Sequence, residues 1–424
     1  MRGLRTGDAF MVPGGRTYPL TVPTRPSQHE LDEFLTRGVS DVSVLGDLRS
    51  ALASGQRQLR IKQGFDPTSA NLHLGHAIPL RKLRKLSQWG HEIVLIVGDW
   101  TTQIGDPTDQ DLSRPLRSRD EVMENAQTYL DQFHLIVPRE NTRIVLQDEW
   151  YGKFGLRDVI QLTSKFTAQQ ILAREEFRKR LDKKTAIPIK DLLYPLLQAY
   201  DSVAIEADVE FGGTDQLFNI LTGRDLQEMV GQRAQSVFIV DLLEGLDGLK
   251  MSKSKPAQSI WLVDPPAVVY GKVMSIDDKL MPHYFEWATE LPLEEVRATL
   301  DALARKDVHP REAKRKLART ITTELHSAAA ADEAEHEFDR VHKEGAAPDA
   351  VPTVDVTVNG QKEVPIVDLI ASAFGKSKRE ARQLVSQNGV RVDGTVASEG
   401  TKVPVKGEPL LQIGRRQAAR IRFR

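Results

Sequence analysis

His73-Leu74-Gly75-His76 and Lys250-Met251-Ser252-Lys253-Ser254 are the two most informative stretches of this chain, and they bracket about two hundred residues of alternating strand and helix pattern. The first places two imidazoles three positions apart at the start of a helix expected over residues 77–89, after a strand expected over residues 59–64. The second places two ammonium groups three positions apart in a short loop. Imidazole and helix-dipole donors opposite mobile cations suit a polyanion whose negative charge grows during reaction, such as a nucleoside triphosphate cleaved at its α-phosphate.

Either stretch alone has a commoner explanation. Two histidines three apart on a helix are more often metal ligands or surface residues, and a Lys-Ser-Lys loop is usually a solvated turn. The order of the stretches, their separation and the Asn71-Leu72 lead-in favour one shared nucleotide site.

Three short apolar runs indicate further strands of a buried parallel sheet, at residues 93–97, 144–146 and 237–240. Long helical segments are expected at residues 119–133 and 159–182. The sequence therefore predicts an α/β fold with a Rossmann-like, doubly wound parallel sheet, whose ligand lies over the carboxyl ends of the strands.

The pattern after residue 258 predicts helices alone, at residues 293–305, 311–326 and 332–343. A linker and a small α+β unit follow, with helices at residues 366–374 and from Lys376, then a strand and tight turn at residues 389–394. From Lys376 to Arg424 there are twelve Lys or Arg against four Asp or Glu, a net charge of +8 in a chain whose total is −1. This asymmetry indicates a polyanion-binding module, the alternative being a basic helical hairpin without a ligand.

The composition excludes several classes of protein. A chain of 424 residues is long enough for two or three domains, and the absence of cysteine excludes disulfides, thiolate metal sites and cysteine nucleophiles. No apolar run approaches the ~20 residues that span a bilayer. The first 25 residues lack the apolar segment of a signal peptide, so we expect a loose extension on a cytoplasmic protein.

One helical face suggests an amino-acid pocket. Tyr194, Gln198 and Asp201 stand at positions i, i+4 and i+7 of an expected helix. A phenol, an amide and a carboxylate lining one cavity could hold an ammonium group and a phenolic hydroxyl together. The alternative is a half-buried helix with ordinary polar contacts.

The two opening stretches resemble the signature motifs of class I aminoacyl-tRNA synthetases, His-Ile-Gly-His and Lys-Met-Ser-Lys-Ser, with Leu74 in place of isoleucine. Four further segments resemble those of bacterial tyrosyl-tRNA synthetases, in the same order: Gly64-Phe65-Asp66-Pro67-Thr68, Gly105-Asp106-Pro107-Thr108, residues 194–201 and Gly212-Gly213-Thr214-Asp215-Gln216. The carboxy-terminal unit resembles a small RNA-binding fold shared with a small-subunit ribosomal protein. The resemblance runs from about residue 60 to the end of the chain.

The resemblance implies a set of site residues. Tyrosine would be bound by Asp106, Tyr194, Gln198, Asp201, Gln216 and Gln63, with Asp201 accepting a hydrogen bond from the phenolic hydroxyl. ATP would be bound by Asp66, Gly75, His73, His76, Asp215, Lys250, Ser252 and Lys253. The residues that assist the reaction would be His73, His76, Lys250, Lys253 and Thr68. RNA would be contacted by Lys376, Lys378, Arg379, Arg382, Arg415 and Arg416.

Two positions depart from the family pattern. Lys62 stands where many members have a tyrosine that also bonds the substrate hydroxyl, and Gln147 stands where asparagine is frequent. A lysine at position 62 could be buried against a carboxylate or point elsewhere. These departures indicate a subfamily and not another substrate, because Asp201 is kept; the sister tryptophanyl enzymes have little use for it.

The resemblance implies a tyrosine–tRNA ligase that uses ATP with Mg²⁺, binds tRNA(Tyr) and L-tyrosine, forms a homodimer and has no dedicated protein metal site. The expected organisation is an extension (1–28), a catalytic domain (29–248) with a dimerisation insertion (about 110–210), a mobile loop (249–258), a helical anticodon-binding domain (259–343), a linker (344–360) and a basic RNA-binding domain (361–424). Two other functions stay open: an RNA-binding regulator on a retired synthetase scaffold, and a small nucleotidyltransferase.

Overall fold

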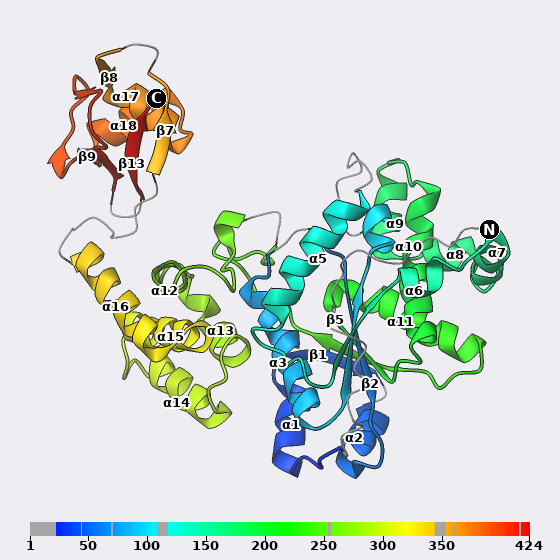
Figure 1. The fold of residues 1–424 in the computed structure, drawn as a ribbon. Coiled ribbons are helices and arrows are strands. Elements are labelled where there is room, and N and C mark those ends of the chain that lie inside the picture. The colour runs from blue at the N-terminus through cyan, green and yellow to red at the C-terminus, as the bar shows by residue number, and fades with distance from the viewer. Residues whose placement is uncertain are drawn as a thin grey trace. The chain divides into compact units, whose positions relative to one another are not determined.

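The computed structural model describes residues 23–43, 45–68, 71–107, 118–252, 256–343, 353–358, 361–414 and 417–424. The chain divides into two compact units (Figure 1), one of Met1–Pro265 with Lys272–Leu317 and one of Pro266–Gly271 with Ala318–Arg424. The predicted start of a separate helical domain at residue 259 does not coincide with this division. Lys253, Arg415, Arg416, most of the predicted extension and much of the predicted linker lie outside the described residues.

A six-stranded sheet forms the centre of the first unit, in the order β1-β6-β5-β2-β3-β4. β1 runs antiparallel to β6, and the other neighbours are parallel. Every residue from Ile93 to Val97 of β3 is at most 1% exposed, as expected for an inner strand covered on both faces. The strands are β1 (Val39–Ser43), β2 (Arg60–Phe65), β3 (Glu92–Val97), β4 (Thr142–Leu146), β5 (Val209–Gly213) and β6 (Ser236–Val240).

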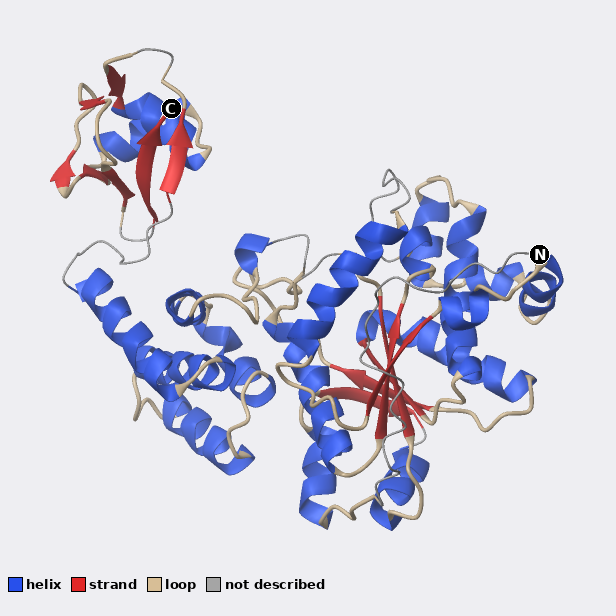
Figure 2. Ribbon diagram, viewed as in Figure 1, coloured by secondary structure: helices blue, strands red, loops and turns tan. Residues whose placement is uncertain are grey.

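Helices lie on both sides of this sheet, α3 and α5 on one side and α10 and α11 on the other (Figure 2). The doubly wound parallel fold predicted from the sequence is therefore confirmed, with one antiparallel edge strand. The helices of this part are α1 (Gln28–Thr36), α2 (Leu45–Ser54), α3 (Leu74–Gln88), α4 (Thr101–Ile104), α5 (Arg119–Phe133), α6 (Asp148–Tyr151), α7 (Leu156–Thr163), α8 (Ala168–Leu172), α9 (Glu175–Asp182), α10 (Ile189–Ala204), η1 (Thr214–Gln216) and α11 (Leu217–Met229).

Three details of the sequence prediction were wrong. β1 and β5 were not foreseen as strands, and Gly64 lies inside β2, paired with Ile96, instead of forming a turn. The single helical segment expected at residues 159–182 is broken into α7, α8 and α9. The break follows from local capping, because Thr167 and Gln170 form a capping box that starts α8.

From Pro256 to Lys343 the regular elements among the described residues are all helices, as predicted for the part after residue 258. They are η2 (Pro256–Gln258), α12 (Pro266–Met274), η3 (Asp278–Leu280), α13 (Met281–Trp287), α14 (Leu293–Ala304), α15 (Pro310–Leu325) and α16 (Ala328–Lys343). Among the described residues, no helix has the length and apolar character needed to span a membrane.

The carboxy-terminal part has its own core, formed by side chains such as Ile366, Leu369, Leu411 and Ile421, each fully buried. Its five-stranded sheet has the order β10-β9-β12-β13-β7, and β11 pairs with β8. β7 pairs in parallel with β13, so the part of the predicted linker that holds β7 belongs to this domain. The elements are β7 (Thr353–Val356), β8 (Glu363–Pro365), α17 (Ile366–Phe374), α18 (Lys378–Ser386), β9 (Val390–Val392), β10 (Thr395–Val396), β11 (Lys402–Pro404), β12 (Leu410–Ile413) and β13 (Gln417–Phe423).

Candidate active site

A cavity of about 290 Å³ opens at the carboxyl ends of the parallel strands. In a doubly wound sheet this edge is where ligands bind, because the loops that follow the strands meet there. Ten of the residues predicted for the site line this one cavity: Gln63, Asp66, Thr68, His76, Asp106, Tyr194, Gln198, Asp201, Asp215 and Gln216.

The carboxylate of Asp201 is buried on the wall that α10 contributes to the cavity. Its side chain accepts hydrogen bonds from Gln147 Nε2 (2.7 Å), Trp150 Nε1 (3.2 Å) and the Tyr151 hydroxyl (3.1 Å). Burial raises the pKa of the Asp201 carboxyl to about 7, although the positive charge of Lys62 and the hydrogen bonds oppose that rise. Tyr194 and Gln198 line the same cavity from α10, as their spacing predicted.

Asp66 directly follows β2, and two side chains that line the cavity hold its carboxylate in place. Its carboxylate accepts from Thr101 Oγ1 (2.6 Å) and from the Tyr194 hydroxyl (3.0 Å). Burial raises its pKa to about 7. Gly98 at the end of β3 makes room for this carboxylate, because a Cβ there would stand 2.2 Å from Asp66 Oδ1. Asp66 therefore contacts Tyr194, which was predicted to bind the amino acid. The prediction that Asp66 binds ATP did not include this contact.

Asp106 and Gln216 meet across the cavity although 110 residues separate them. Gln216 Nε2 donates to Asp106 Oδ2 at 2.8 Å, and Gln216 Oε1 accepts from Asn219 Nδ2 at 3.0 Å. The other carboxylate oxygen of Asp106 forms an ion pair with Arg174, whose side chain is 1% exposed. A buried arginine thus orients the acid, a contact that the sequence analysis missed.

The first signature motif forms the start of α3. The backbone N–H of His73 donates to His76 Nδ1 at 3.1 Å, and the two rings lie 3.8 Å apart between centroids. His76 lines the cavity, and its ring orientation is set by this bond. A Cβ on Gly75 would stand 3.1 Å from His73 Nδ1, so glycine leaves the space that this pair of rings uses.

The segment that follows the second signature motif is held beside the first motif by backbone hydrogen bonds. Leu74 N donates to Ile260 O (2.8 Å), and Leu262 N donates to Leu72 O (2.9 Å). Near the start of the loop, Met251 is 2% exposed and its N–H donates to Leu243 O. The segments on either side of the loop are therefore anchored beside the start of α3.

Lys250, which was predicted to bind the phosphates of ATP, pairs with Asp215 on the cavity wall. Its Nζ forms a 2.7 Å ion pair with Asp215 Oδ2, and both side chains are partly exposed, at 49% and 32%. The pair joins a lysine expected at the phosphates to the residue expected at the ribose. Ser252 lies close by, and its carbonyl oxygen accepts from Ser259 Oγ at 2.9 Å.

The sequence left open where the side chains of Lys62 and Gln147 lie, and their contacts in the structure answer this. Lys62 is fully buried and forms an ion pair with Glu210 Oε1 at 2.9 Å, so it does not reach into the cavity. Glu210 lines the cavity and was not predicted, although a lone charged residue in the apolar strand β5 is a signal that the sequence carries. Gln147 anchors Asp201 and also accepts from Thr101 N at 3.0 Å.

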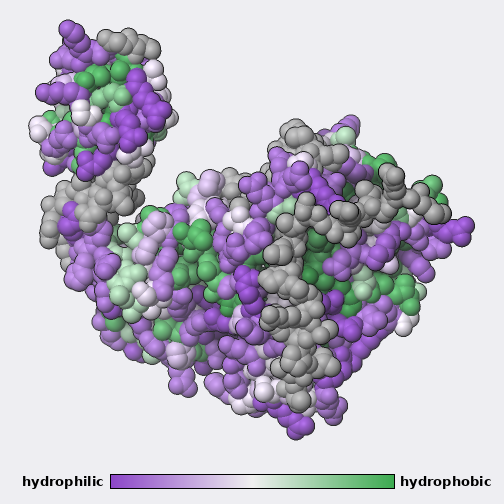
Figure 3. All heavy atoms as spheres, in the orientation of Figure 1, coloured by the Kyte–Doolittle hydropathy of each residue, from purple (hydrophilic) through white to green (hydrophobic). Residues whose placement is uncertain are grey.

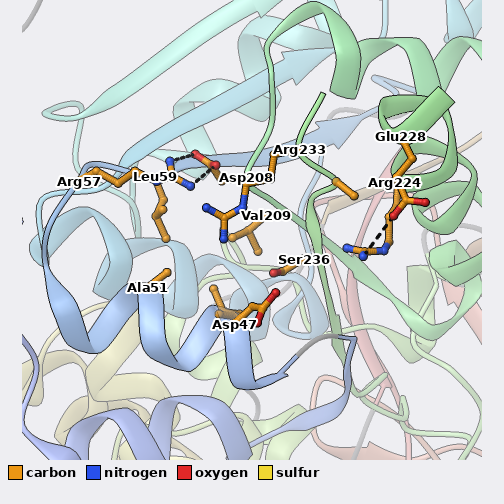
Figure 4. Close-up of a pocket in the computed structure, with 12 residues that line it drawn as sticks. Asp47, Ala51, Arg57, Leu59, Asp208, Val209, Arg224, Glu228, Arg233 and Ser236 are labelled. Atoms are coloured by element: carbon orange, nitrogen blue, oxygen red, sulfur yellow. Dashed lines mark hydrogen bonds and ion pairs between the residues drawn. The ribbon is translucent and has the colours of Figure 1, made fainter. Parts of the chain in front are cut away.

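A second cavity, of about 250 Å³, lies at the amino ends of the strands, opposite the first cavity (Figure 4). Leu59, Val209 and Ser236, at or near the starts of β2, β5 and β6, line it. Its charged groups are largely paired with each other. Arg57 binds Asp208 through two contacts of 2.8 and 2.6 Å, and Arg224 faces Glu228. None of the residues predicted for the site lines it.

The predicted RNA-binding cations in the described part of the carboxy-terminal domain lie at the start of α18. Ser377 and Glu380 form a capping box there, and Ala381 and Val385 face the core. Lys378, Arg379 and Arg382 are exposed and Lys376 is partly exposed, which forms a basic helix start. Lys378 also forms a 2.7 Å ion pair with Asp368.

Comparisons with known proteins agree with this geometry. Residues 54–343 match the family described as tRNA synthetases class I (W and Y), and residues 364–408 match the S4 domain. The chain is 46% identical over 392 residues to a tyrosine–tRNA ligase of Dehalococcoides mccartyi, which covers 92% of this chain and 98% of that protein. It is 40% identical over 396 residues to the tyrosine–tRNA ligase of Geobacter sulfurreducens, with the same coverage of 92% and 98%.

Solved structures share the fold. A crystal structure of tyrosyl-tRNA synthetase complexed with L-tyrosine, from Archaeoglobus fulgidus, matches with a TM-score of 0.58 at 21% identity, over 72% of this chain and 99% of that one. The family match covers well over half of the chain, and close relatives cover nearly all of it. The chain therefore belongs to the class I tRNA synthetases of the W and Y family.

Proposed function

We propose that the cavity binds L-tyrosine beside ATP and that this chain is a tyrosine–tRNA ligase. It activates tyrosine to tyrosyl-adenylate, releases pyrophosphate, and transfers the tyrosyl group to the 3′ end of tRNA(Tyr). The observation that carries this proposal is the buried Asp201 carboxylate, which lines a cavity together with Tyr194 and Gln198 from the same helix. A buried acceptor of this kind favours a substrate with a hydroxyl over one without, because an unpaired buried charge is costly.

The amino-acid end of the cavity would fix the substrate at both of its charged groups. Tyr194, Gln198 and Asp106 surround the position of the α-ammonium, and Asp66 adds a second carboxylate next to Tyr194. Gln216 would contact the substrate carboxylate. Gln63 Oε1 is buried without a hydrogen-bond partner among the described residues, so it is available to a bound substrate.

The reaction needs no protein nucleophile. A carboxylate oxygen of tyrosine attacks the α-phosphorus of ATP, the new O–P bond forms, and the bond to the bridging oxygen breaks as pyrophosphate leaves. The protein contributes positioning and stabilisation of the added negative charge. The residues proposed for the phosphates are His73, His76, Thr68, Lys250, Ser252 and Lys253, with Gly75 next to the nucleotide and Asp215 at the ribose.

The Lys250–Asp215 ion pair has a consequence for the cycle. Both groups are proposed to bind ATP, so nucleotide binding must replace their 2.7 Å contact with contacts to phosphate and ribose. The loop that holds Lys250 would then move with the nucleotide and return when pyrophosphate leaves.

Mg²⁺ would enter with ATP. In the described part of the chain no three His, Cys, Asp or Glu side chains are placed to hold a metal ion, so phosphate oxygens and water would supply its ligands. The ion would neutralise phosphate charge, and the protein residues above would orient the reacting groups.

A homodimer is proposed from an apolar surface on the insertion. Leu156, Val159 and Ile160 stand at i, i+3 and i+4 on α7 and are 76%, 37% and 58% exposed. Figure 3 shows hydrophobic side chains at the surface on the side where Figure 1 labels α7 and α8. A second copy of the chain would cover this surface, because exposed apolar stripes of this kind mark protein contacts.

The carboxy-terminal S4 domain is proposed to bind tRNA through the basic start of α18, with Arg415 and Arg416 as further cations. Phosphate contacts of this kind tolerate many sequences and weaken with salt. The helical region 259–343 would read the anticodon, and residues 249–258 would form the moving loop. The enzyme would act in the cytoplasm, where protein synthesis takes place.

The decisive experiment is amino-acid-dependent ATP–pyrophosphate exchange by the purified protein, with tyrosine, phenylalanine and tryptophan in parallel. Exchange with tyrosine alone is the expected result. Exchange with tryptophan would overturn the role of Asp201, and no exchange with any of the three would favour an RNA-binding regulator on a retired scaffold.

A further inference from the structure

Lys62 and Glu210 form a cross-strand pair next to the tyrosine cavity. They are register partners on the neighbouring parallel strands β2 and β5. Their side chains are 0% and 2% exposed, and Lys62 Nζ lies 2.9 Å from Glu210 Oε1. A buried ion pair gains little net stability over apolar side chains of the same size, so its presence calls for another explanation.

All three N–H groups of Lys62 have acceptors within the protein. Besides Glu210, the ammonium donates to Gln198 O at 2.9 Å and to Ser202 Oγ at 2.7 Å. No donor remains for the hydroxyl of a bound tyrosine. Lys62 therefore does not take over the substrate contact that a tyrosine makes at this position in other members of the family.

Glu210 continues the network to the side chain of Gln198. Its Oε2 accepts from Ser202 Oγ (3.0 Å) and from Gln235 Nε2 (2.5 Å), and its Oε1 faces Gln198 Nε2 at 3.4 Å. Because the amide N–H₂ of Gln198 faces a carboxylate, its amide oxygen is the group left for the cavity. An ammonium ligand needs such an acceptor.

The charge of Lys62 also acts on Asp201. Burial raises the pKa of the Asp201 carboxyl to about 7, Lys62 lowers it, and Glu210 raises it further. The other groups that contact this carboxylate are the neutral side chains of Gln147, Trp150 and Tyr151. Lys62 and Glu210 thus have opposite effects on the pKa of the acceptor of the phenolic hydroxyl, and the carboxyl of Asp66, whose pKa Asp201 raises, is a further titratable group coupled to it.

We propose that Lys62 and Glu210 are a positioning pair for the amino-acid substrate. Together they hold Gln198 with its amide oxygen free for the substrate ammonium, and Lys62 keeps Asp201 charged for the phenolic hydroxyl. Many other members of the family have a tyrosine at position 62 that contacts the substrate hydroxyl directly. Here the pair acts indirectly, through Gln198 and Asp201. This inference rests on the tyrosine pocket proposed above.

The test compares the wild-type enzyme with Lys62→Met/Glu210→Gln in pyrophosphate exchange. The double variant removes both charges, whereas Lys62→Met alone leaves a buried carboxylate unpaired. We expect the KM for tyrosine to rise roughly tenfold, the loss of about one charged hydrogen bond. The KM for ATP should change less than twofold, and the acid limb of kcat/KM for tyrosine should move to higher pH.

Glu210→Gln alone is a second variant with the opposite pH signature. It leaves the positive charge of Lys62 unbalanced, so the acid limb should move to lower pH while the KM for tyrosine rises. Lys82→Met is the matched control, since Lys82 is also a buried lysine, with its Nζ on a backbone carbonyl, that of Phe34, and it does not line the tyrosine cavity. It should leave the KM for tyrosine and the pH profile unchanged.

A folded double variant with the wild-type KM for tyrosine and an unchanged pH profile would overturn the proposal. So would an equal rise of both KM values, or the same rise in Lys82→Met, because either result means a general structural role. If the proposed tyrosine pocket itself is wrong, the result differs, because pyrophosphate exchange by the wild-type enzyme would then not depend on tyrosine.

Discussion

Replacing Asp201 with asparagine tests the tyrosine pocket with little change in volume. A carboxylate has about four acceptor positions, and three face the donors of Gln147, Trp150 and Tyr151, the last of which shares its one proton with Leu197 O at 2.5 Å. One position is therefore left for the substrate hydroxyl. Hydrogen bonds to charged groups contribute about 1.5–3 kcal/mol and those between neutral groups about 0.5–1.5 kcal/mol. The neutral amide should thus cost about 1–1.5 kcal/mol, or roughly tenfold in kcat/KM for tyrosine.

In Asp201→Asn the kcat/KM for phenylalanine should rise, whereas that for tyrosine falls. Phenylalanine leaves the last acceptor position of Asp201 unpaired in the wild-type enzyme, and this penalty is smaller for a neutral amide. The tyrosine-to-phenylalanine preference should therefore fall by roughly ten- to hundredfold. The assay is pyrophosphate exchange at saturating ATP and pH 8, above the pKa of about 7 of this carboxyl.

The matched control is Asp191→Asn. Asp191 is also buried on α10, but it pairs with Arg180 at 2.7 Å and does not line the cavity. It should lose stability and keep the wild-type preference. An Asp201→Asn enzyme that still discriminates like the wild type, or a control that loses discrimination equally, would refute the reasoning.

Four further predictions follow from the same structure. Because burial raises the pKa of Asp66 and of Asp201 to about 7, kcat/KM for tyrosine should fall below that pH, and Asp201→Asn should remove one protonation step from a profile measured between about pH 5.5 and 9. Both carboxyls bind protons in the native state that the unfolded chain releases, so they should lower the free energy of unfolding as pH rises from about 4 to 7; denaturant titrations should show a smaller decline in Asp201→Asn. Lys250→Ala should lower the single-turnover rate of adenylate formation by about 10²–10³ and leave the KM for tyrosine nearly unchanged, since this lysine pairs with Asp215, the residue proposed for the ribose of ATP. Ile160→Asp should convert the proposed dimer to a monomer in sedimentation experiments without loss of thermal stability, because this side chain is 58% exposed in the single chain.

The sequence predicted the parts of the site that follow a local period. Tyr194, Gln198 and Asp201 share a cavity because three and four residues make about one turn of α10. The partner of Lys62 could not be predicted in this way, because β2 and β5 become neighbours only through the order of the sheet. Arg174 was missed for the same reason, since its contact with Asp106 joins two loops that are 68 residues apart.

Some signals were present in the sequence but were outweighed. The apolar spacing of residues 159–182 continues across the end of α7, so a period alone predicts one helix, while the Thr167–Gln170 capping box marks the new start. The alternation Thr353-Val354-Asp355-Val356 is typical of a strand, yet the neighbouring Pro and Gly residues favoured a linker. Pairing with β13, at the far end of the domain, decides between these interpretations.

The anchoring of the second signature motif beside the first has a consequence for how its cations act. Met251 and Ile260 are both buried, and the bonds from Leu74 and to Leu72 fix the segment that follows. The eight residues between Met251 and Ile260 include Lys253, and Lys250 directly precedes Met251. A short tether of this kind gives a group an effective concentration on the order of millimolar or above at its target. The two lysines proposed for the phosphates of ATP are therefore already present as part of the same molecule, whereas the Mg²⁺ proposed above enters with ATP at each turnover.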